Sequence, residues 1–468
     1  MIISSVGPSA QQRSIPYDAQ RTVNLYPLAD AQGKSPIMLQ GTPGLELFSA
    51  GTVEGRALFT AAATGRCFAV EGFTFYEVLS DGTRTSYGSL LTAGGIVKMI
   101  ENGLQILVMD GTYGYIFTYA TNTFVQITNP NFPNPAGYGD FVGGYFLVPQ
   151  LGTGKFYISD LYNGLNYQAL NFATQESSPD NLYSIFNVQG QAWLMGSGSI
   201  EIWTLTGSSR FPFELISGAV IDMGIAGPAC AEAIDNSILW IGQNEDGGLI
   251  VYRATGFTPQ RISTEPMELL LGKVTNRASL RTWKYQQEGH VFFIITGGDM
   301  ETSLVFDLTT QLWHERAFLN TQGFYEAHRG IACTFAFGKT LVIDRVNGNI
   351  YRMALDIYSD NGMPLAADRI FTHISEENQN VRFASLVVDC ETGVGTQTGQ
   401  GFDPQMMMSM SNDSGRTYFA HQRRTMGRVG TYLTRMVFTR LGMARIRTFR
   451  IRITDPVKRA IFALYLNV

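Results

Sequence analysis

The chain has 468 residues, which is too long for a single ordinary hydrophobic core. A repeat architecture or two to three domains is therefore expected. Charged residues make up only 16% while aromatic residues reach 12% and glycine occurs 50 times, which is typical of many short strands joined by tight turns. The formal net charge is −5 and no run of about 18 apolar residues occurs, so no membrane insertion is expected.

Strand-length runs rich in Val, Ile, Phe, Tyr and Thr follow one another along the chain. They include residues 66–72, 104–111, 143–149, 237–242, 290–296 and 340–344. Asn-Gly and Asp-Gly pairs separate such runs and supply the positive φ angles of hairpin turns, starting at Asp81, Asn102, Asp110, Asn163, Asp246, Asn347 and Asn361. One short helix is expected between Thr264 and Gly272. The pattern predicts an all-β protein.

Two of these runs are copies of one another. Residues 66–76 overlay residues 105–115 at an offset of 39, with Gly72 over Gly111 and Tyr76 over Tyr115. This period matches the four-stranded blade of a β-propeller. We therefore predict an N-terminal arm and closing strand in residues 1–50 and a β-propeller of about seven blades in residues 51–360. A set of β-sandwiches is the alternative.

The character of the chain changes after Asn361, and residues 361–468 are expected to form an additional C-terminal, Arg-rich β-domain. Between Arg416 and Arg459 there are twelve Lys or Arg residues and one acid, Asp455, a net charge of +11. Subtracting this from the total of −5 leaves −16 on the rest of the chain. The basic charge is thus concentrated in one segment.

The arginines of this segment are candidates for a contact with an anionic partner. Charged and apolar residues alternate from Arg445 to Ile453, so a strand with one bulge would place its arginines on a single face. A solvated face paired with acids of the same chain is the other interpretation. The candidates for a contact with a partner or DNA are Arg423, Arg424, Arg428, Arg435, Arg440, Arg445, Arg447, Arg450 and Arg452.

Of these two partners, a protein is favoured over DNA.

A second motif lies just before the arginines. Ser411, Asp413, Gly415, Thr417 and Tyr418 match the Asp-box, a hairpin turn found in sialidase-like propellers and other β-proteins. The motif describes a turn and not a reaction. The motif and the aromatic content are both compatible with a glycan-binding or sialidase-like β-propeller. This is retained as an alternative to the function that the family resemblance below implies.

Motifs for enzymatic chemistry are missing from the sequence. The four cysteines are far apart, which predicts neither a zinc site nor a disulfide framework. The histidines show no metal-binding spacing, and neither a nucleophile elbow nor a complete phosphate-binding loop occurs. We predict no catalytic residue, no metal site and no cofactor.

Five stretches together resemble the packaged-DNA stabilisation proteins, the head-completion proteins that form the tail hub or nozzle of short-tailed phages. These stretches are spread over nearly the whole chain and keep the expected order. They are QRTVNLYP (20–27), GTPGL (41–45), GAVIDMGIAGP (218–228), LVFDLTTQLWHER (304–316) and the Arg-rich end (415–457).

The resemblance implies a structural protein of the virion tail, assembled in the host cytoplasm into a homo-oligomer, typically a hexameric ring. It implies a place below the portal and its adaptor, where the ring extends the DNA channel and stabilises packaged DNA. The implied partners are the portal adaptor, the tail needle or plug, tailspike or fibre proteins and possibly the packaged DNA.

Overall fold

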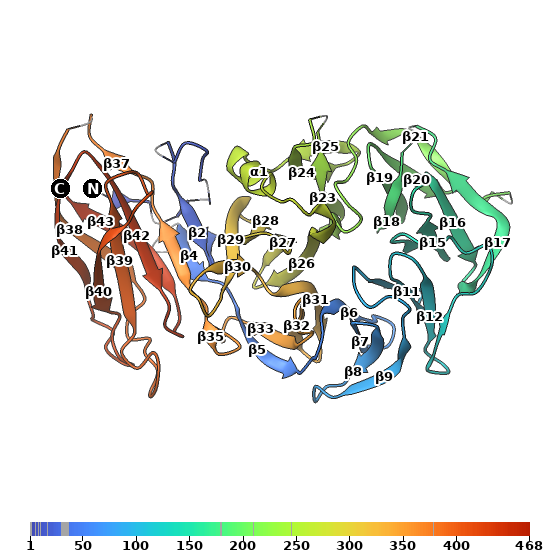
Figure 1. Ribbon diagram of the computed structural model, residues 1–468, viewed down its shortest axis with the longest axis horizontal. Helices are drawn as coiled ribbons and strands as arrows, with labels where there is room; N and C mark the ends of the chain where they lie inside the picture. Colours follow the sequence, from blue (N-terminus) through green and yellow to red (C-terminus); the bar gives the residue numbers. More distant parts are fainter. Residues whose placement is uncertain are drawn as a thin grey trace.

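The computed structural model describes the whole chain except residues 1, 5, 8, 10, 16, 30–36, 178, 179, 209, 245 and 378. Within the described residues, seven four-stranded antiparallel blades form a closed ring, and a β-sandwich is attached to one side of it. Figure 1 shows the propeller on the right and the sandwich, which holds both chain ends, on the left. The predicted all-β fold, a propeller of about seven blades with an additional C-terminal β-domain, is confirmed.

The first five blades are formed in chain order, each from four consecutive strands. Blade 1 contains β6 (Gly55–Thr60), β7 (Cys67–Glu71), β8 (Thr74–Val78) and β9 (Arg84–Ser89). Blade 2 contains β10 (Lys98–Glu101), β11 (Gln105–Met109), β12 (Gly114–Thr118) and β13 (Thr123–Gln126). Blade 3 contains β14 (Asp140–Val142), β15 (Tyr145–Pro149), β16 (Lys155–Asp160) and β17 (Asn163–Thr174). Blade 4 contains β18 (Leu182–Val188), β19 (Gln191–Gly196), β20 (Ile200–Leu205) and β21 (Phe213–Ile221), and blade 5 contains β22 (Ala231–Ile234), β23 (Ser237–Gln243), β24 (Leu249–Thr255) and β25 (Thr258–Arg261).

The last two blades close the ring and connect it to the sandwich. Blade 6 contains β26 (Arg281–Gln287), β27 (His290–Thr296), β28 (Ser303–Asp307) and β29 (Leu312–Leu319), with β30 (Tyr325–Ala327) paired to its outer strand. Blade 7 contains β31 (Gly330–Ala336), β32 (Lys339–Asp344), β33 (Ile350–Ala354) and, as its outermost strand, β5 (Gly44–Ser49). Because β5 precedes blade 1 in the chain, the N-terminal segment holds blade 7 beside blade 1.

Hydrophobic side chains fill the space between each pair of neighbouring blades. Between blades 1 and 2, for example, Phe68 and Phe75 pack against Phe117 and Phe124. Since both faces of a blade are buried in this way, its inner strands are continuously apolar and do not alternate. This explains runs such as residues 290–296, where every position from Phe292 to Thr296 is buried.

The 39-residue repeat has a structural basis. Gly72 and Gly111 lie in the hairpin turns between the second and third strands of blades 1 and 2, and both have positive φ angles. In each of these blades a tyrosine of the third strand donates a hydrogen bond to the acid before the turn, and blade 7 repeats the arrangement. The pairs are Tyr76 and Glu71 (3.3 Å), Tyr115 and Asp110 (3.2 Å), and Tyr351 and Asp344 (3.2 Å).

The expected helix is confirmed as α1 (Glu265–Leu271), which begins after Thr264 and ends at Gly272. It lies between blades 5 and 6 with Met267 and Leu271 buried, and a 3₁₀ turn, η1 (Arg277–Ser279), follows it. Both elements belong to the connection between the two blades.

The sandwich takes strands from both ends of the chain. One of its sheets contains β3 (Leu25–Ala29), β4 (Ile37–Gly41), β43 (Ala460–Asn467), β38 (Val381–Cys390) and β41 (Met436–Ala444), with β1 (Ile2–Ile3) beside β43. The other contains β36 (Ala367–Ile370), β42 (Ile446–Ile453), β39 (Gln405–Ser411) and β40 (Phe419–Thr425), with β37 (Ile374–Ser375) beside β42. Met406, Met408 and Met410 lie in the core between the two sheets.

One sheet runs without interruption from the propeller into the sandwich. The short strand β2 (Arg21–Val23) pairs in parallel with β29 of blade 6 and antiparallel with β36, which in turn pairs with β42. On the other side, β34 (Ser359–Asp360) pairs with β5 of blade 7 and with β35 (Met363–Pro364). The strand-paired connection to the sandwich therefore runs from blade 6 through β2 and β36, while β34 and β35 extend the sheet of blade 7.

Candidate functional site: the basic edge of the sandwich

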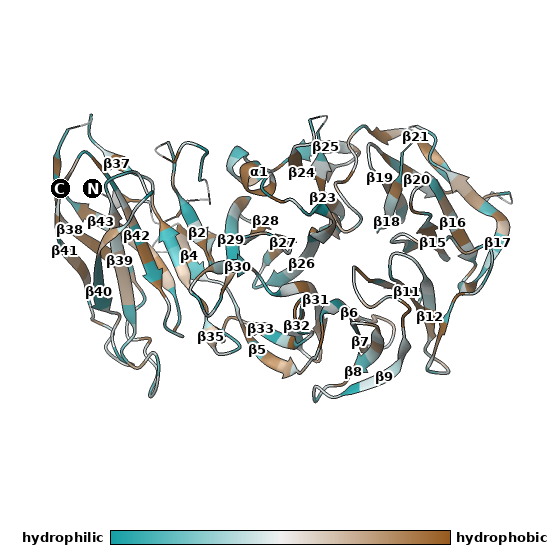
Figure 2. Ribbon diagram, in the orientation of Figure 1, coloured by the Kyte–Doolittle hydropathy of each residue, from teal (hydrophilic) through white to brown (hydrophobic). Residues whose placement is uncertain are grey.

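The candidate arginines lie on β40, the loop after it, β41 and β42. The strands β40 and β41 are the outer strands of the two sandwich sheets, whereas β42 is an interior strand with neighbours on both sides. Figure 2 shows β40 as hydrophilic along most of its length. The location of each strand decides which of its arginines reach solvent.

Arg450 and Arg452 on β42 face inward, toward blade 6. Both guanidinium groups bind the carboxylate of Asp368 on β36, at 2.6 and 2.5 Å. The Arg452 guanidinium also donates to the Tyr325 hydroxyl of β30, at 3.2 Å. Burial alone would raise the pKa of Asp368, but the two arginines hold it well below its usual range. Arg452 therefore links β42 to β30 beside blade 6, whereas Arg450 is held within the sandwich, and both guanidinium groups already have an internal acid as partner.

The position of Arg447 shows that the bulge expected in β42, which would place its arginines on one face, was a wrong prediction. The pairing of β42 with β39 and β36 proceeds without a register shift, so the expected bulge does not occur there. Strand alternation then places Arg447 on the core side, where it is 1% exposed. It donates to the Leu441 carbonyl at 2.6 Å and lies over the Phe383 ring, and burial lowers its pKa.

Five of the candidate arginines are exposed and form no ion pair with any residue that the structure describes. They are Arg423 on β40, Arg428 and Arg435 in the connecting loop, Arg440 on β41 and Arg445 after it. We call these five residues the basic edge. Arg440 sits at a bulge in the pairing of β41 with β38 and has a φ of 61°, a strained conformation for a side chain of this size.

Arg424, the remaining candidate, is half-buried and joins the two sheets. Its Nε donates to the Val437 carbonyl of β41 at 2.9 Å, and its guanidinium lies over the Phe438 ring. It therefore supports the basic edge from within and contributes little of its own charge to solvent.

Apolar side chains project beside the basic edge. In the loop between β40 and β41, Tyr432 is 70% exposed and Leu433 is 99% exposed. Val429 in the same loop and Met443 on β41 are also exposed. Exposed apolar groups next to unpaired cations are typical of a surface that a partner covers.

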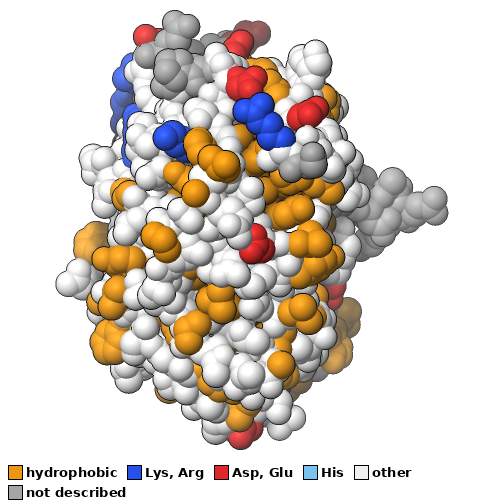
Figure 3. Space-filling model, turned by 90° about the vertical axis from the view of Figure 1, so that its right-hand side faces the viewer, with side chains coloured by type: hydrophobic (Ala, Val, Ile, Leu, Met, Phe, Trp, Pro, Cys, Tyr) orange, Lys and Arg blue, Asp and Glu red, His pale blue; other side chains and the backbone are white. Residues whose placement is uncertain are grey.

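The opposite end of the molecule differs in charge. Figure 3, which looks at the propeller from the end farthest from the sandwich, shows scattered hydrophobic side chains and few charged ones. This end of the propeller therefore lacks a concentration of cations like that of the basic edge.

The Asp-box residues form the turn between β39 and β40. Asp413 accepts hydrogen bonds from the Ser411 and Thr417 hydroxyls, both at 2.6 Å, and from two backbone amides. These hydrogen bonds, led by that of Ser411, lower the pKa of Asp413. Gly415 has a φ of 98°, and the Tyr418 ring lies against the Arg450 guanidinium. The Asp413 carboxylate therefore holds the turn together through both of its oxygens, which is the structural role expected of the motif.

A second cluster of charged residues, on the axis of the propeller, was missed by sequence reasoning. Its members come from the first strands of four blades, and apart from Arg281 and Lys284 on β26 they lie far apart in the sequence. They include Arg56, Lys98, Glu232, Arg281 and Lys284. No sequence motif could have brought them together, because only the closure of the ring does so.

Other kinds of site were sought in the described part of the chain. It contains no group of three or more His, Cys, Asp or Glu residues placed to hold a metal ion. None of its helices has the length and apolar character needed to cross a membrane. The four cysteines are unpaired, and Cys67, Cys230 and Cys390 are buried.

Two family models match the chain, one over each part of the fold. The model described as Bacteriophage P22 Gp10, beta-propeller matches residues 5–358, and the one described as Bacteriophage P22 Gp10, beta-sandwich matches residues 368–468. No curated protein sequence matches the chain.

Solved structures with a related shape are distant in sequence. The N-terminal domain of Nup159 has 10% identity and a TM-score of 0.41, with 71% of this chain and 98% of that chain covered. The computationally designed Ika8 protein has 9% identity and a TM-score of 0.39, with 67% and 100% covered. The WD40 repeats of RRP9 have 9% identity and a TM-score of 0.41, with 67% and 99% covered.

Proposed function

Because the chain belongs to the family of bacteriophage P22 Gp10, and is therefore a structural phage tail protein of the P22 type, we propose that it forms a ring in the tail of a short-tailed phage. The ring lies below the portal and its adaptor, extends the DNA channel and helps to retain packaged DNA. Its other partners are a needle or plug and tailspike or fibre proteins, and the oligomer is a hexamer.

The observation that carries this proposal is that both family models match in chain order, one on the propeller and one on the sandwich. A chain that shared only a propeller with this family would have many other possible functions, since propellers serve many. The joint match over nearly the whole chain supports a common role in the tail.

The basic edge is proposed as the contact with an acidic protein surface in this assembly. Its five cations have no internal counter-charge among the described residues, and the rest of the chain outside Arg416–Arg459 carries −16. Neighbouring Tyr432 and Leu433 supply apolar area that a protein partner would bury. DNA phosphates would use the cations but would leave these apolar groups in water, so a protein is the better fit.

The test compares two variants of equal charge change in an assembly assay. The edge variant combines Arg423→Gln, Arg435→Gln, Arg440→Gln and Arg445→Gln. The control variant replaces four exposed cations of the propeller by Gln, at Lys155, Arg210, Arg261 and Lys273. Each is mixed with DNA-filled heads that carry portal and adaptor from the same phage, and bound protein and nuclease-accessible DNA are measured.

We expect the control variant to join the heads and protect the genome as the wild type does, and the edge variant to bind weakly and leave DNA accessible. Equal assembly of all three proteins would rule out the basic edge as the contact. Failure of the wild type to bind any head would count against the tail-ring function itself.

The salt dependence of binding separates the protein partner from DNA. A DNA contact releases counterions, so the logarithm of its affinity falls by about 0.9 per phosphate for each unit of log salt concentration. Partly buried arginine–carboxylate pairs lose less. We expect the shallow dependence. If the logarithm of the affinity instead falls with log salt concentration as steeply as four or five phosphate contacts require, and the edge variant lacks this steep dependence, the basic edge contacts DNA.

A further inference from the structure

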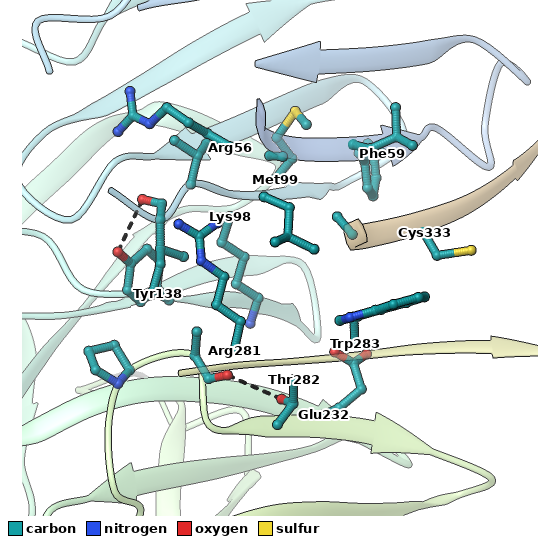
Figure 4. A pocket seen from close by; sticks show the side chains of 18 of the residues that line it. Arg56, Phe59, Lys98, Met99, Tyr138, Glu232, Arg281, Thr282, Trp283 and Cys333 are labelled. Atoms are coloured by element: carbon teal, nitrogen blue, oxygen red, sulfur yellow. Dashed lines mark hydrogen bonds between the residues drawn. The ribbon is translucent and has the colours of Figure 1, made fainter. Parts of the chain in front are cut away.

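The propeller has a partly open cavity of about 260 Å³ on its axis, where the first strands of the blades converge. Figure 4 shows its lining, with Arg56, Lys98, Arg281 and Tyr138 toward one side and Phe59 and Trp283 toward the other. Four cationic side chains and one carboxylate line it, namely Arg56, Lys98, Arg281, Lys284 and Glu232. The cavity therefore carries an excess of positive charge within low-dielectric walls, which strengthens its attraction for anions.

Three of the four cations have partners in the protein. Arg56 donates to three backbone carbonyls at 2.6 to 2.9 Å. Lys98 donates to a backbone carbonyl at 3.1 Å, lies over the Phe186 ring and forms an ion pair with Asp140 at 4.0 Å. The Lys284 ammonium lies 3.2 Å from the Glu232 carboxylate. These contacts fix the positions of three positive charges around the cavity.

Arg281 differs from the other three, because its guanidinium forms no hydrogen bond or ion pair with any residue that the structure describes. Burial lowers the pKa of Arg281, and the guanidinium groups of Arg56 and Arg345 act in the same direction. Tyr138 and Glu54 oppose this effect without outweighing it. Arg281 is only partly buried, so its five guanidinium donors are left to solvent or to a ligand in the cavity.

We propose that the axial cavity binds a small divalent oxyanion of the phosphate class, which accepts hydrogen bonds from the free Arg281 guanidinium. Arg56 and Arg281 are the two lining cations without a carboxylate partner among the described residues, so a divalent anion balances them more fully than a monovalent carboxylate does. Planar guanidinium groups also match phosphate oxygens well. The volume suits a phosphate with a few waters, each of which takes about 30 Å³. It is too small for a folded segment of another protein.

The test uses the purified full-length chain and calorimetric titration with inorganic phosphate, against sodium chloride of equal ionic strength. Phosphate should bind with measurable heat and raise the unfolding temperature with the logarithm of its concentration, because a ligand that binds only the folded state stabilises it. Acetate should bind at least about tenfold more weakly, since it carries one charge. Phenyl phosphate is the second probe. If it binds more tightly than inorganic phosphate, the ligand of the cavity is a phosphate monoester with a ring near Trp283. If the two bind equally, the ligand is free phosphate.

Two variants and a control make the assignment specific. Arg281→Gln should weaken phosphate binding by about tenfold to a hundredfold. In phosphate-free buffer it should unfold at the same temperature as the wild type or higher, because it removes an unpaired cation. Lys98→Gln should weaken binding less, and Arg253→Gln, on the outer side of blade 5 where Arg253 pairs with Asp235, should not change it.

The opposite results would overturn the proposal. These are equal unfolding temperatures in phosphate and chloride without heat of binding, acetate binding as tight as phosphate, or full phosphate affinity in Arg281→Gln. A variant that fails to fold is replaced by Arg281→Lys, which keeps the charge and loses the forked donors, and should bind phosphate more weakly than the wild type.

Discussion

Replacing Asp368 by Asn should destabilise the sheet that links the sandwich to blade 6. The Asp368 carboxylate is 2% exposed and neutralises two arginines of β42, while Tyr325 of blade 6 donates to the same carboxylate at 2.5 Å. Removing one partner of a buried ion pair costs about 3 to 5 kcal/mol. Because Arg450 and Arg452 are 24% and 28% exposed and can recover water, we expect the lower end, about 3 kcal/mol.

The pH dependence of this loss has a defined sign. The pKa of Asp368 is held well below its usual range in the folded protein, so its stabilisation is fully present above its unfolded value of about 4. It is lost as the pH falls below that value. The difference between Asp368→Asn and the wild type should therefore be full at pH 7 and shrink toward about pH 2.

Differential scanning calorimetry, with hydrogen exchange of the β36 and β42 amides, measures the effect. Adding Arg450→Gln and Arg452→Gln to Asp368→Asn should recover part of the loss, because the uncompensated charges are removed with the carboxylate. Asp235→Asn, which removes an exposed acid 3.4 Å from Arg253, is the matched control and should cost less than about 1 kcal/mol. An Asp368→Asn protein within about 0.5 kcal/mol of the wild type at pH 7, or a triple variant no better than the single one, would refute the reasoning.

Three further predictions concern other parts of the chain. The buried Asp360 carboxylate accepts no hydrogen bond from the residues that the structure describes, and burial raises its pKa to about 7 although Arg316 and Arg459 oppose this. It therefore destabilises the folded chain increasingly from about pH 4 to pH 7, and Asp360→Asn should remove this slope and gain up to about 4 kcal/mol at pH 8 in calorimetric unfolding. An unchanged slope would contradict the assignment. Tyr115→Phe removes a hydroxyl that donates a hydrogen bond to Asp110. The free energy of unfolding measured in urea should fall by about 1 to 2 kcal/mol, and an unchanged value would mean that this contact does not stabilise the blade. Leu433→Ser should leave the unfolding temperature within error and weaken binding to adaptor-bearing heads, and normal binding would exclude the exposed loop from the interface.

Much of the propeller could be predicted from the sequence because its signals are local. Turn glycines such as Gly72 and Gly111 mark hairpins, and the apolar runs between them have strand length. The sandwich was harder, because its sheets take β3 and β4 from the first fifty residues and its linking strand β2 has only three residues. Pairing between strands more than 300 residues apart leaves no local pattern.

The surroundings of the arginines could likewise be predicted only in part from the sequence. Their number predicted a basic surface, and the exposed residues such as Arg423 and Arg440 lie on it. Alternation alone could not show that Arg447 faces the core or that Arg450 and Arg452 share one buried acid, since Asp368 lies more than 80 residues earlier in the chain. Whether a basic strand is an edge or an interior strand is decided by its neighbours and not by its own residues.

The most direct test of the account is a cryo-electron microscopy structure of the DNA-filled particle with this protein in its tail. We predict a ring of copies below the adaptor in which Arg423, Arg435 and Arg440 lie within about 4 Å of carboxylates of a neighbouring protein, with Leu433 covered by that neighbour. A basic edge that faces open solvent, or that contacts the phosphates of the DNA in the channel, would contradict it.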